Sequence, residues 1–285
     1  MEKIILSAPA KLNLTLDILR RREDGYHDLC MVMQSVTLAD EVTLEKNSSG
    51  TITCESNWEH IPCDERNLAV KAAKAFFAYT GVACDGLHIT LLKKVPSGAG
   101  MAGGSTDAAA VLRGLRELYA PQLSRDELEM IGAQVGSDVP YCVRGGTALA
   151  QGRGEILQDL PSALHCWYVI CKPDFSVSTP MLFSRVKVDA LQDRPHTEGM
   201  MQALAEGDTE KTAVLLKNVF EEVLPEEFSE VFAIKEALLS YGALGAAMTG
   251  SGPTVFGVFK TEEMAEKAYA MLKERYAETY LAEPV

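Results

Sequence analysis

The segment Pro96-Ser97-Gly98-Ala99-Gly100-Met101-Ala102-Gly103-Gly104-Ser105-Thr106-Asp107 lies between a predicted strand and a predicted helix. Glycine at this density lets backbone N–H groups converge on an anion, and the start of the helix adds free N–H groups and a positive dipole end. The segment therefore predicts a phosphate-binding site. A tight strand-to-helix turn that holds no ligand is the structural alternative.

Other phosphate-binding classes fit this glycine-rich loop less well. The spacing Gly-x-Gly-x-x-Gly that begins at Gly98 also occurs in dinucleotide-binding Rossmann folds, which would make the chain an NAD(P) enzyme. Against this, Lys93–Pro96 separates the strand from the turn, and the downstream acids Asp126 and Glu127 begin a helix. No Gly-Lys-Ser/Thr follows the loop, which excludes a Walker motif, and the protein-kinase motifs are absent.

Hydrophobic periodicity on both sides of the loop predicts a mixed α/β (α+β) chain. Apolar and polar residues alternate strictly from Lys11 to Leu19, so Lys11 and Asn13 share the polar face of a strand. Further strands are predicted at 29–38, 41–46, 51–55, 87–93, 167–171, 243–249 and 254–259. Helices are predicted at 67–79 and 105–119, and another follows a cap at Ser124. A last helix begins at a Thr261 cap and is expected to bury Met264, Ala268 and either Met271 or Leu272.

Composition limits the class of protein and its partners. The 285 residues are 47% hydrophobic and 24% charged, as in globular proteins, and the length suggests two domains, which we place at 1–155 and 156–285. A net charge of −13 disfavours nucleic acid and anionic membranes as partners. Seven scattered cysteines, and the lack of a secretory or membrane-spanning stretch, predict a cytoplasmic location.

Two charged residues are candidates for chemistry. Asp138, in Gly136-Ser137-Asp138-Val139-Pro140-Tyr141, lies in a Gly-to-Pro break where a helix is not expected to continue. It is either a turn former or a general base that takes a proton from a substrate hydroxyl. Lys11 is either a solvated strand lysine or a cation that holds a carboxylate or phosphate.

The turn Arg22-Glu23-Asp24-Gly25-Tyr26-His27 is a hairpin connection or a loop that recognises a planar ring, because tyrosine offers a stacking face and histidine a hydrogen-bond donor and acceptor. The other four histidines form no ligand-spaced cluster, so no protein-held metal is predicted. Mg²⁺ would arrive with nucleotide phosphates.

Three segments together resemble the GHMP small-molecule kinases: Ala8-Pro9-Ala10-Lys11-Leu12-Asn13-Leu14, the loop Pro96–Asp107, and Thr249-Gly250-Ser251-Gly252-Pro253-Thr254. The resemblance implies the two-domain GHMP kinase fold, with the active site in the inter-domain cleft and the loop around the phosphates of ATP. Arg22–His27, Gly136–Tyr141 and Gly152-Arg153-Gly154-Glu155 resemble the members that phosphorylate the 2-hydroxyl of diphosphocytidyl methylerythritol in the non-mevalonate isoprenoid pathway.

The resemblance also implies roles for single residues. Asp138 matches the catalytic base and Lys11 its electrostatic partner, and the loop from Pro96 to Thr106 matches the ATP-binding segment. The residues that match substrate-binding positions are Asn13, Tyr26, His27, Thr179 and Phe183. Asp107 either lies near a phosphate or caps the helix. The expected partners are small molecules, and the chain is a monomer or a homodimer.

One departure and two alternatives remain open. The family commonly has leucine followed by three glycines where this chain has Met101-Ala102-Gly103-Gly104, so Ala102 needs a backbone conformation that tolerates a Cβ atom. A kinase for homoserine, mevalonate or a sugar would keep Lys11, Asp138 and the loop. A ligand sensor without catalysis would bind nucleotide or substrate and release no ADP.

Overall fold

The computed structural model describes residues 2–161 and 164–285. The chain forms two compact units, each built from three segments: unit 1 comprises Met1–Ala10, Ala39–Val95 and Ala102–Gly145, and unit 2 comprises Lys11–Leu38, Pro96–Met101 and Gly146–Val285. Two long strands and the glycine-rich loop therefore each contribute to both units. No helix within the described residues combines the length and the apolar character that crossing a membrane requires.

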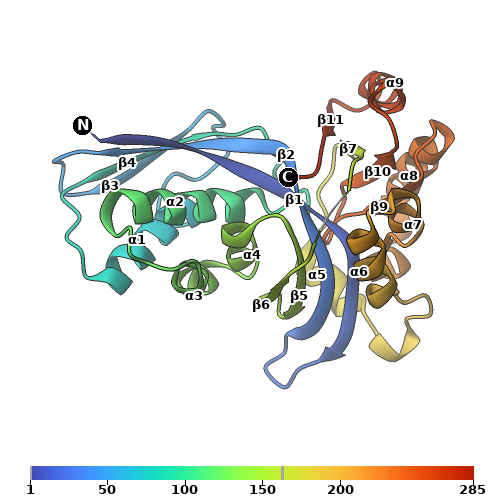
Figure 1. Cartoon of the computed structure of the whole chain (residues 1–285), viewed down its shortest axis with the longest axis horizontal. Coiled ribbons are helices and arrows are strands. Elements are labelled where there is room, and N and C mark those ends of the chain that lie inside the picture. The colour runs from blue at the N-terminus through green and yellow to red at the C-terminus, as the bar shows by residue number, and fades with distance from the viewer. Residues whose placement is uncertain (1, 162–163) are drawn as a thin grey trace. The chain divides into compact units, whose positions relative to one another are not determined.

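Strands and helices are mixed along the chain, which begins with three consecutive strands (Figure 1). In order they are β1 (Lys3–Arg21), β2 (His27–Lys46), β3 (Ile52–Ser56), α1 (Leu68–Thr80), β4 (Leu87–Leu92), α2 (Gly103–Tyr119), α3 (Arg125–Val135), α4 (Val139–Arg144), β5 (Thr147–Gly152), β6 (Ile156–Asp159), β7 (Trp167–Lys172), α5 (Thr179–Arg185), η1 (Val188–Ala190), α6 (Thr197–Glu206), α7 (Thr209–Val214), β8 (Lys217–Asn218), η2 (Val219–Val223), η3 (Glu226–Phe228), α8 (Glu230–Ser240), β9 (Gly245–Met248), β10 (Val255–Phe259), α9 (Glu262–Lys273) and β11 (Glu278–Ala282).

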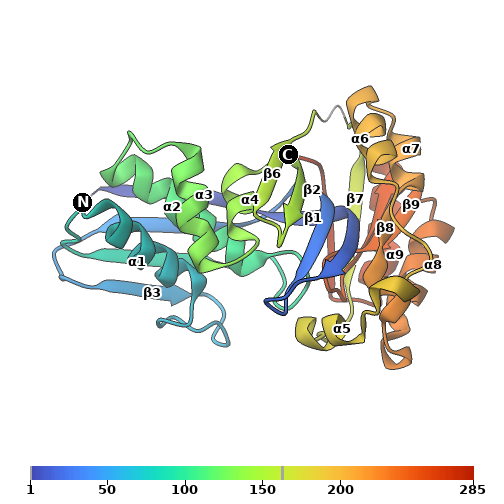
Figure 2. The same cartoon turned by 90° about the horizontal axis from the view of Figure 1, so that it is seen from below.

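Unit 1 is a sheet covered by helices on one face, as both views show (Figures 1 and 2). Its strands follow the order β3-β4-β2-β1, with β4 parallel to β3 and antiparallel to β2. Leu87, Ile89 and Leu91 of β4 are fully buried between less buried neighbours, the alternation of a half-buried strand. The mixed pairing differs from the parallel sheet of a Rossmann fold, so the dinucleotide-binding alternative is wrong.

Unit 2 contains two sheets. The remaining parts of β1 and β2 pair with β8 and β5 respectively, and β5 continues to β6. The second sheet has the order β11-β7-β10-β9, and α8 and α9 pack on it. The centre of this sheet consists of β7 and β10, whose apolar residues Val169, Ile170, Val255 and Phe256 are fully buried.

Most predicted elements are confirmed, and four details are corrected. The predicted strands 29–38 and 41–46 form the single strand β2. Both faces of β1 are buried near Lys11, so its polar residues lie in the protein interior. Helix α9 begins after its Thr261 cap and buries Ala268 and, of the alternatives Met271 and Leu272, Leu272, as predicted. Met264 is instead 36% exposed, because Ala265 faces the core.

The fourth correction concerns the Gly-to-Pro break. The short helix α4 begins there, directly after Asp138, with Pro140 in its first turn. Proline is tolerated in a first turn because the N–H that it lacks has no intrahelical acceptor there. The boundary predicted after Glu155 stays a prediction.

Candidate active site

The second half of the glycine-rich loop opens helix α2 in unit 1. Ala102, at the N-cap, has φ 61°, the only positive φ among the described residues other than glycine. The first turn of α2 contains no acidic residue, so its free N–H groups and dipole favour an anion. The Thr106 hydroxyl donates to the Gly103 carbonyl at 2.9 Å, and Ser105 lies half-buried beside it.

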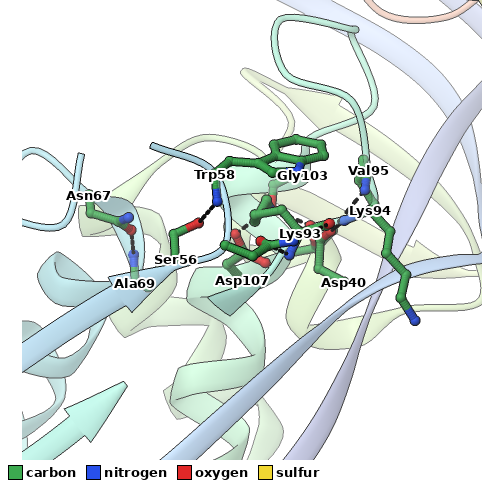
Figure 3. A network of polar contacts seen from close by, with 12 residues as sticks. Asp40, Ser56, Trp58, Asn67, Ala69, Lys93, Lys94, Val95, Gly103 and Asp107 are labelled. Atoms are coloured by element: carbon green, nitrogen blue, oxygen red, sulfur yellow. Dashed lines mark hydrogen bonds and ion pairs between the residues drawn. The ribbon is translucent and has the colours of Figure 1, made fainter. Parts of the chain in front are cut away.

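Both ends of this loop are held by a buried ion cluster of Asp40, Lys93 and Asp107 (Figure 3). Asp40 accepts the backbone N–H groups of Lys94 and Val95 at 2.5 and 2.8 Å, where the chain enters the loop. The Lys93 ammonium donates to both carboxylates, at 2.5 Å to Asp107, and lies 3.4 Å from the carbonyl oxygen of Gly103, where the chain leaves the loop.

The cluster contains two carboxylates and one ammonium, all at least 95% buried. The Oδ1 atom of Asp107 is buried without a hydrogen-bond partner, whereas both oxygens of Asp40 accept hydrogen bonds. Burial, and then the nearby Asp40, raise the pKa of Asp107 to about 7, although Lys93 acts in the opposite direction. Asp107 lies inside α2 and does not cap it. Of the two roles that the sequence offered for Asp107, the helix cap is therefore wrong.

The first half of the loop belongs to unit 2 and packs against the Thr249–Thr254 segment. Gly98 and Gly100 have φ values of 61° and 70°, so both need glycine's conformational freedom. A Cβ atom on Gly100 would lie 2.3 Å from the carbonyl oxygen of Thr249, closer than two such atoms can approach. The two glycine-rich segments therefore depend on a close backbone contact.

Lys11 lies at the centre of this contact with its charge buried. Its ammonium donates to Asn13 Oδ1 at 2.6 Å and to the carbonyl oxygen of Gly100 at 2.7 Å. Asn13 Oδ1 also accepts the backbone N–H of Gly250 at 2.9 Å, and the Asn13 N–H donates to Thr249 Oγ1 at 3.0 Å. The predicted residues Lys11, Asn13 and Gly100 are thus brought together.

Sequence reasoning did not place Thr249 and Gly250 in the site, although it singled out their motif. The signal was the glycine density of Thr249–Thr254, which permits the same close approach as the loop. A Cβ atom on Gly250 would lie 2.6 Å from the carbonyl oxygen of Gly100. The segment contacts Asn13 directly, through the Thr249 hydroxyl and the Gly250 N–H.

A group of aromatic rings lies elsewhere in unit 2. The His27 ring stacks on Phe183 with centroids 5.0 Å apart and an angle of 19°, and Phe183 meets the edge of Phe220. Burial, and then the charge of Arg21, hold the pKa of His27 below its usual value, so the neutral imidazole predominates at pH 7. Tyr26, which precedes His27 in the chain, is 54% exposed.

The remaining predicted residues are placed as follows. Thr179 begins α5, and its hydroxyl lies 2.6 Å from that of Ser251. Asp138 is the half-buried N-cap of α4 in unit 1, and its side chain makes no capping hydrogen bond. Across the residues that the structure describes, no group of three or more His, Cys, Asp or Glu side chains is arranged to hold a metal ion.

Two family profiles match the chain. The profile of the GHMP kinases N terminal domain covers residues 67–146, and that of the GHMP kinases C terminal domain covers residues 200–278. A protein of Brevibacillus brevis named 4-diphosphocytidyl-2-C-methyl-D-erythritol kinase is 44% identical over 95% of this chain and 92% of its own length. A protein of that name from Acetivibrio thermocellus is 41% identical over the whole of both chains.

Solved structures give the same result. The crystal structure of a 4-(cytidine 5'-diphospho)-2C-methyl-D-erythritol kinase is 31% identical and matches with a TM-score of 0.83 over 98% of both chains. A homoserine kinase from Cytophaga hutchinsonii matches with a TM-score of 0.78 over 100% of this chain and 95% of its own, at 19% identity, which shows a shared fold. This chain therefore belongs to the GHMP kinases and, within them, to the family of the 4-diphosphocytidyl-2-C-methyl-D-erythritol kinases.

Proposed function

We propose that this protein transfers the γ-phosphoryl group of ATP to the 2-hydroxyl of 4-diphosphocytidyl-2-C-methyl-D-erythritol, releasing ADP and the 2-phosphate. The observation that carries this proposal is the identity of 41% or more, over nearly the whole chain, to relatives named for that substrate. The reaction belongs to the non-mevalonate route to isoprenoid precursors.

The loop from Pro96 to Thr106 would bind the ATP phosphates. Support comes from the left-handed conformation of Gly98, Gly100 and Ala102, which turns the backbone repeatedly, and from the free N–H groups at the start of α2. Mg²⁺ would arrive with the phosphates and neutralise charge on them. Asp107 is not assigned a phosphate contact.

Asp138 would act as the base and Lys11 as its electrostatic partner. In the proposed step the substrate hydroxyl loses its proton to Asp138 while its oxygen attacks the γ-phosphorus. The bond from that phosphorus to the bridging oxygen breaks, and ADP leaves. The buried ammonium of Lys11, which donates to Asn13 Oδ1 and to the carbonyl oxygen of Gly100, would stabilise negative charge on the attacking oxygen.

The substrate would be recognised by Asn13, Tyr26, His27, Thr179 and Phe183. Neutral His27 can donate and accept hydrogen bonds at a cytosine edge, and Tyr26 exposes enough ring to stack on the base. The proposal also includes a small-molecule substrate, a cytoplasmic location for the protein, and a monomeric or homodimeric state.

The first experiment measures ADP release with diphosphocytidyl methylerythritol, beside mevalonate, homoserine and galactose. Turnover of the cytidyl substrate alone is expected. Turnover of a control substrate instead would keep the kinase assignment and reject the cytosine site. No ADP release with any of the four substrates, together with intact nucleotide binding, would favour the ligand-sensor alternative.

A further inference from the structure

Arg153 is a cation that the proposed reaction does not use. Its guanidinium carbon lies 3.8 Å from the centroid of the Tyr26 ring, within the range of a cation–π contact. Its Nε atom is buried without a hydrogen-bond partner, and its charge also acts on the Asp24 carboxylate, whose pKa it helps to lower. The tyrosine ring and Asp24 are therefore the side chains that act on this guanidinium.

The turn that carries Arg153 is fixed by its backbone. Gly152 and Gly154 both have positive φ values, of 69° and 116°, and Glu155 accepts the Arg153 N–H at 2.6 Å. Gly152 also pairs with Leu29 across the β5–β2 ladder, so Arg153 follows a strand that is anchored beside the start of β2. This anchoring places the guanidinium next to Tyr26.

The backbone of Tyr26 is equally constrained. Its N–H donates to Asp24 Oδ1 at 3.1 Å, and its carbonyl oxygen accepts the Arg22 N–H at 2.8 Å. Tyr26 is still 54% exposed as a residue, although the Arg153 guanidinium lies over one face of its ring. Tyr26 therefore has one supported face and one face available for a planar ligand.

We propose that Arg153 is a positioning residue for nucleobase binding: it supports one face of Tyr26 and so orients the other face to stack on the cytosine of the substrate. This inference rests on the proposed function. Without Arg153 the exposed ring would sample other rotamers, and the base would have to order it on binding. The entropy of ordering one such side chain corresponds to about a 3- to 10-fold loss of affinity.

The test measures binding of cytidine and of cytidine monophosphate to the full chain by calorimetry. The variants are Arg153→Leu, which removes the cation, and Arg153→Lys, which keeps one. Arg20→Leu is the matched control, because Arg20 is an exposed arginine on the same hairpin that pairs with Asp28. Circular dichroism and the melting temperature check that each variant folds.

Arg153→Leu is expected to lower the affinity for both ligands by about 3- to 10-fold and to raise KM for the cytidyl substrate by the same factor. Its kcat and its KM for ATP should stay unchanged, which a general loss of structure would not allow. Arg153→Lys should recover part of the affinity, since a lysine ammonium over the ring also makes a cation–π contact. Arg20→Leu should bind like the wild type.

Three results would overturn the role of Arg153 alone. Unchanged affinity in Arg153→Leu would show that Tyr26 needs no support, and tighter binding would show that the guanidinium competes with the base. A loss confined to cytidine monophosphate would make Arg153 a phosphate ligand. Failure of the folded wild type to bind either ligand would overturn the cytosine site and this inference together.

Discussion

Among single residues, Asp107 is a buried carboxylate, 3% exposed, whose charge is incompletely balanced. Its carboxylate shares the Lys93 ammonium with Asp40, and one of its oxygens has no partner. Asp40, in contrast, accepts hydrogen bonds from two backbone N–H groups. The cluster therefore takes up a proton at Asp107, whose pKa is raised to about 7.

This pKa predicts how stability depends on pH. The folded protein retains the Asp107 proton up to about pH 7, whereas the unfolded chain releases it near pH 3.8. Between these values folding takes up a proton, so rising pH disfavours the folded state. Asp107→Asn, which stays neutral, should gain roughly 2 kcal/mol relative to wild type between pH 5 and pH 7.5 in urea unfolding.

The control for this prediction is Asp40→Asn. Replacing the carboxylate that binds Lys94 and Val95 weakens hydrogen bonds that are present throughout this range. This variant should be less stable than wild type at every pH between 5 and 8. A stability difference between Asp107→Asn and wild type that does not change with pH would contradict the protonation of Asp107.

Ala102 supplies a second prediction at this scale. With φ 61° its Cβ atom crowds the backbone, a conformation that costs about 1 kcal/mol more for alanine than for glycine. Ala102→Gly should therefore stabilise the protein by about 1 kcal/mol in urea unfolding. The matched control is Ala99→Gly in the same loop, where alanine is 3% exposed and φ is not positive; this change should destabilise.

Among the helices and strands, hydrophobic periodicity predicted the features that depend on residues close together in the sequence. The alternation around Lys11 predicted a strand, and the Ser124 cap predicted α3, which begins with a complete capping box. The prediction for α9 failed at Met264 alone, because the adjacent Ala265 faces the core in its place, whereas Ala268 and Leu272 are buried as predicted. A pattern alone does not decide between two adjacent apolar stripes.

The ion cluster and the Arg153–Tyr26 contact could not be predicted for a different reason. Asp40 is 53 positions from Lys93, and Arg153 is more than a hundred positions from Tyr26. Such pairs depend on sheet register, which one sequence does not specify. The grouping of Lys11, Asn13 and Gly100 was predictable only because the three motifs resemble one family.

The contact between the two glycine-rich segments gives a prediction for these elements. Gly100→Ala would place a Cβ atom 2.3 Å from the Thr249 carbonyl oxygen, so one segment must move, whereas Gly98→Ala meets only the Ser176 side chain at 2.9 Å. Both glycines have positive φ, so both variants carry the same backbone strain. Gly100→Ala should lose at least about 2 kcal/mol of unfolding free energy, and Gly98→Ala about 1.

ATP binding gives an independent measure of how Gly98→Ala and Gly100→Ala affect the loop. Displacement of the loop in Gly100→Ala should raise KM for ATP more than Gly98→Ala does. Equal effects of the two substitutions on stability and on KM would show that the segments tolerate separation. The close approach would then have no bearing on the phosphate site.

At the scale of the whole molecule, the fold does not specify the substrate. A homoserine kinase and a mevalonate kinase share it at 19% identity, with TM-scores of 0.78 and 0.74. Specificity must therefore come from side chains that the shared architecture carries. In this chain the candidates Tyr26, His27 and Phe183 lie in unit 2, whereas Asp138 and the start of α2 lie in unit 1.

Because the candidate base Asp138 is not among the candidate cytosine-binding residues, substrate binding and chemistry should be separable by mutation. Asp138→Asn keeps the shape of the side chain, and no capping hydrogen bond is lost at α4, so the fold and the affinity for ATP and for cytidine ligands should be unchanged. If Asp138 is the general base, kcat should fall by about 100-fold or more. Steady-state kinetics beside calorimetry of both ligands distinguishes this from a loss of binding. Turnover equal to wild type would remove Asp138 from the mechanism and leave the assignment of the cytosine site untouched.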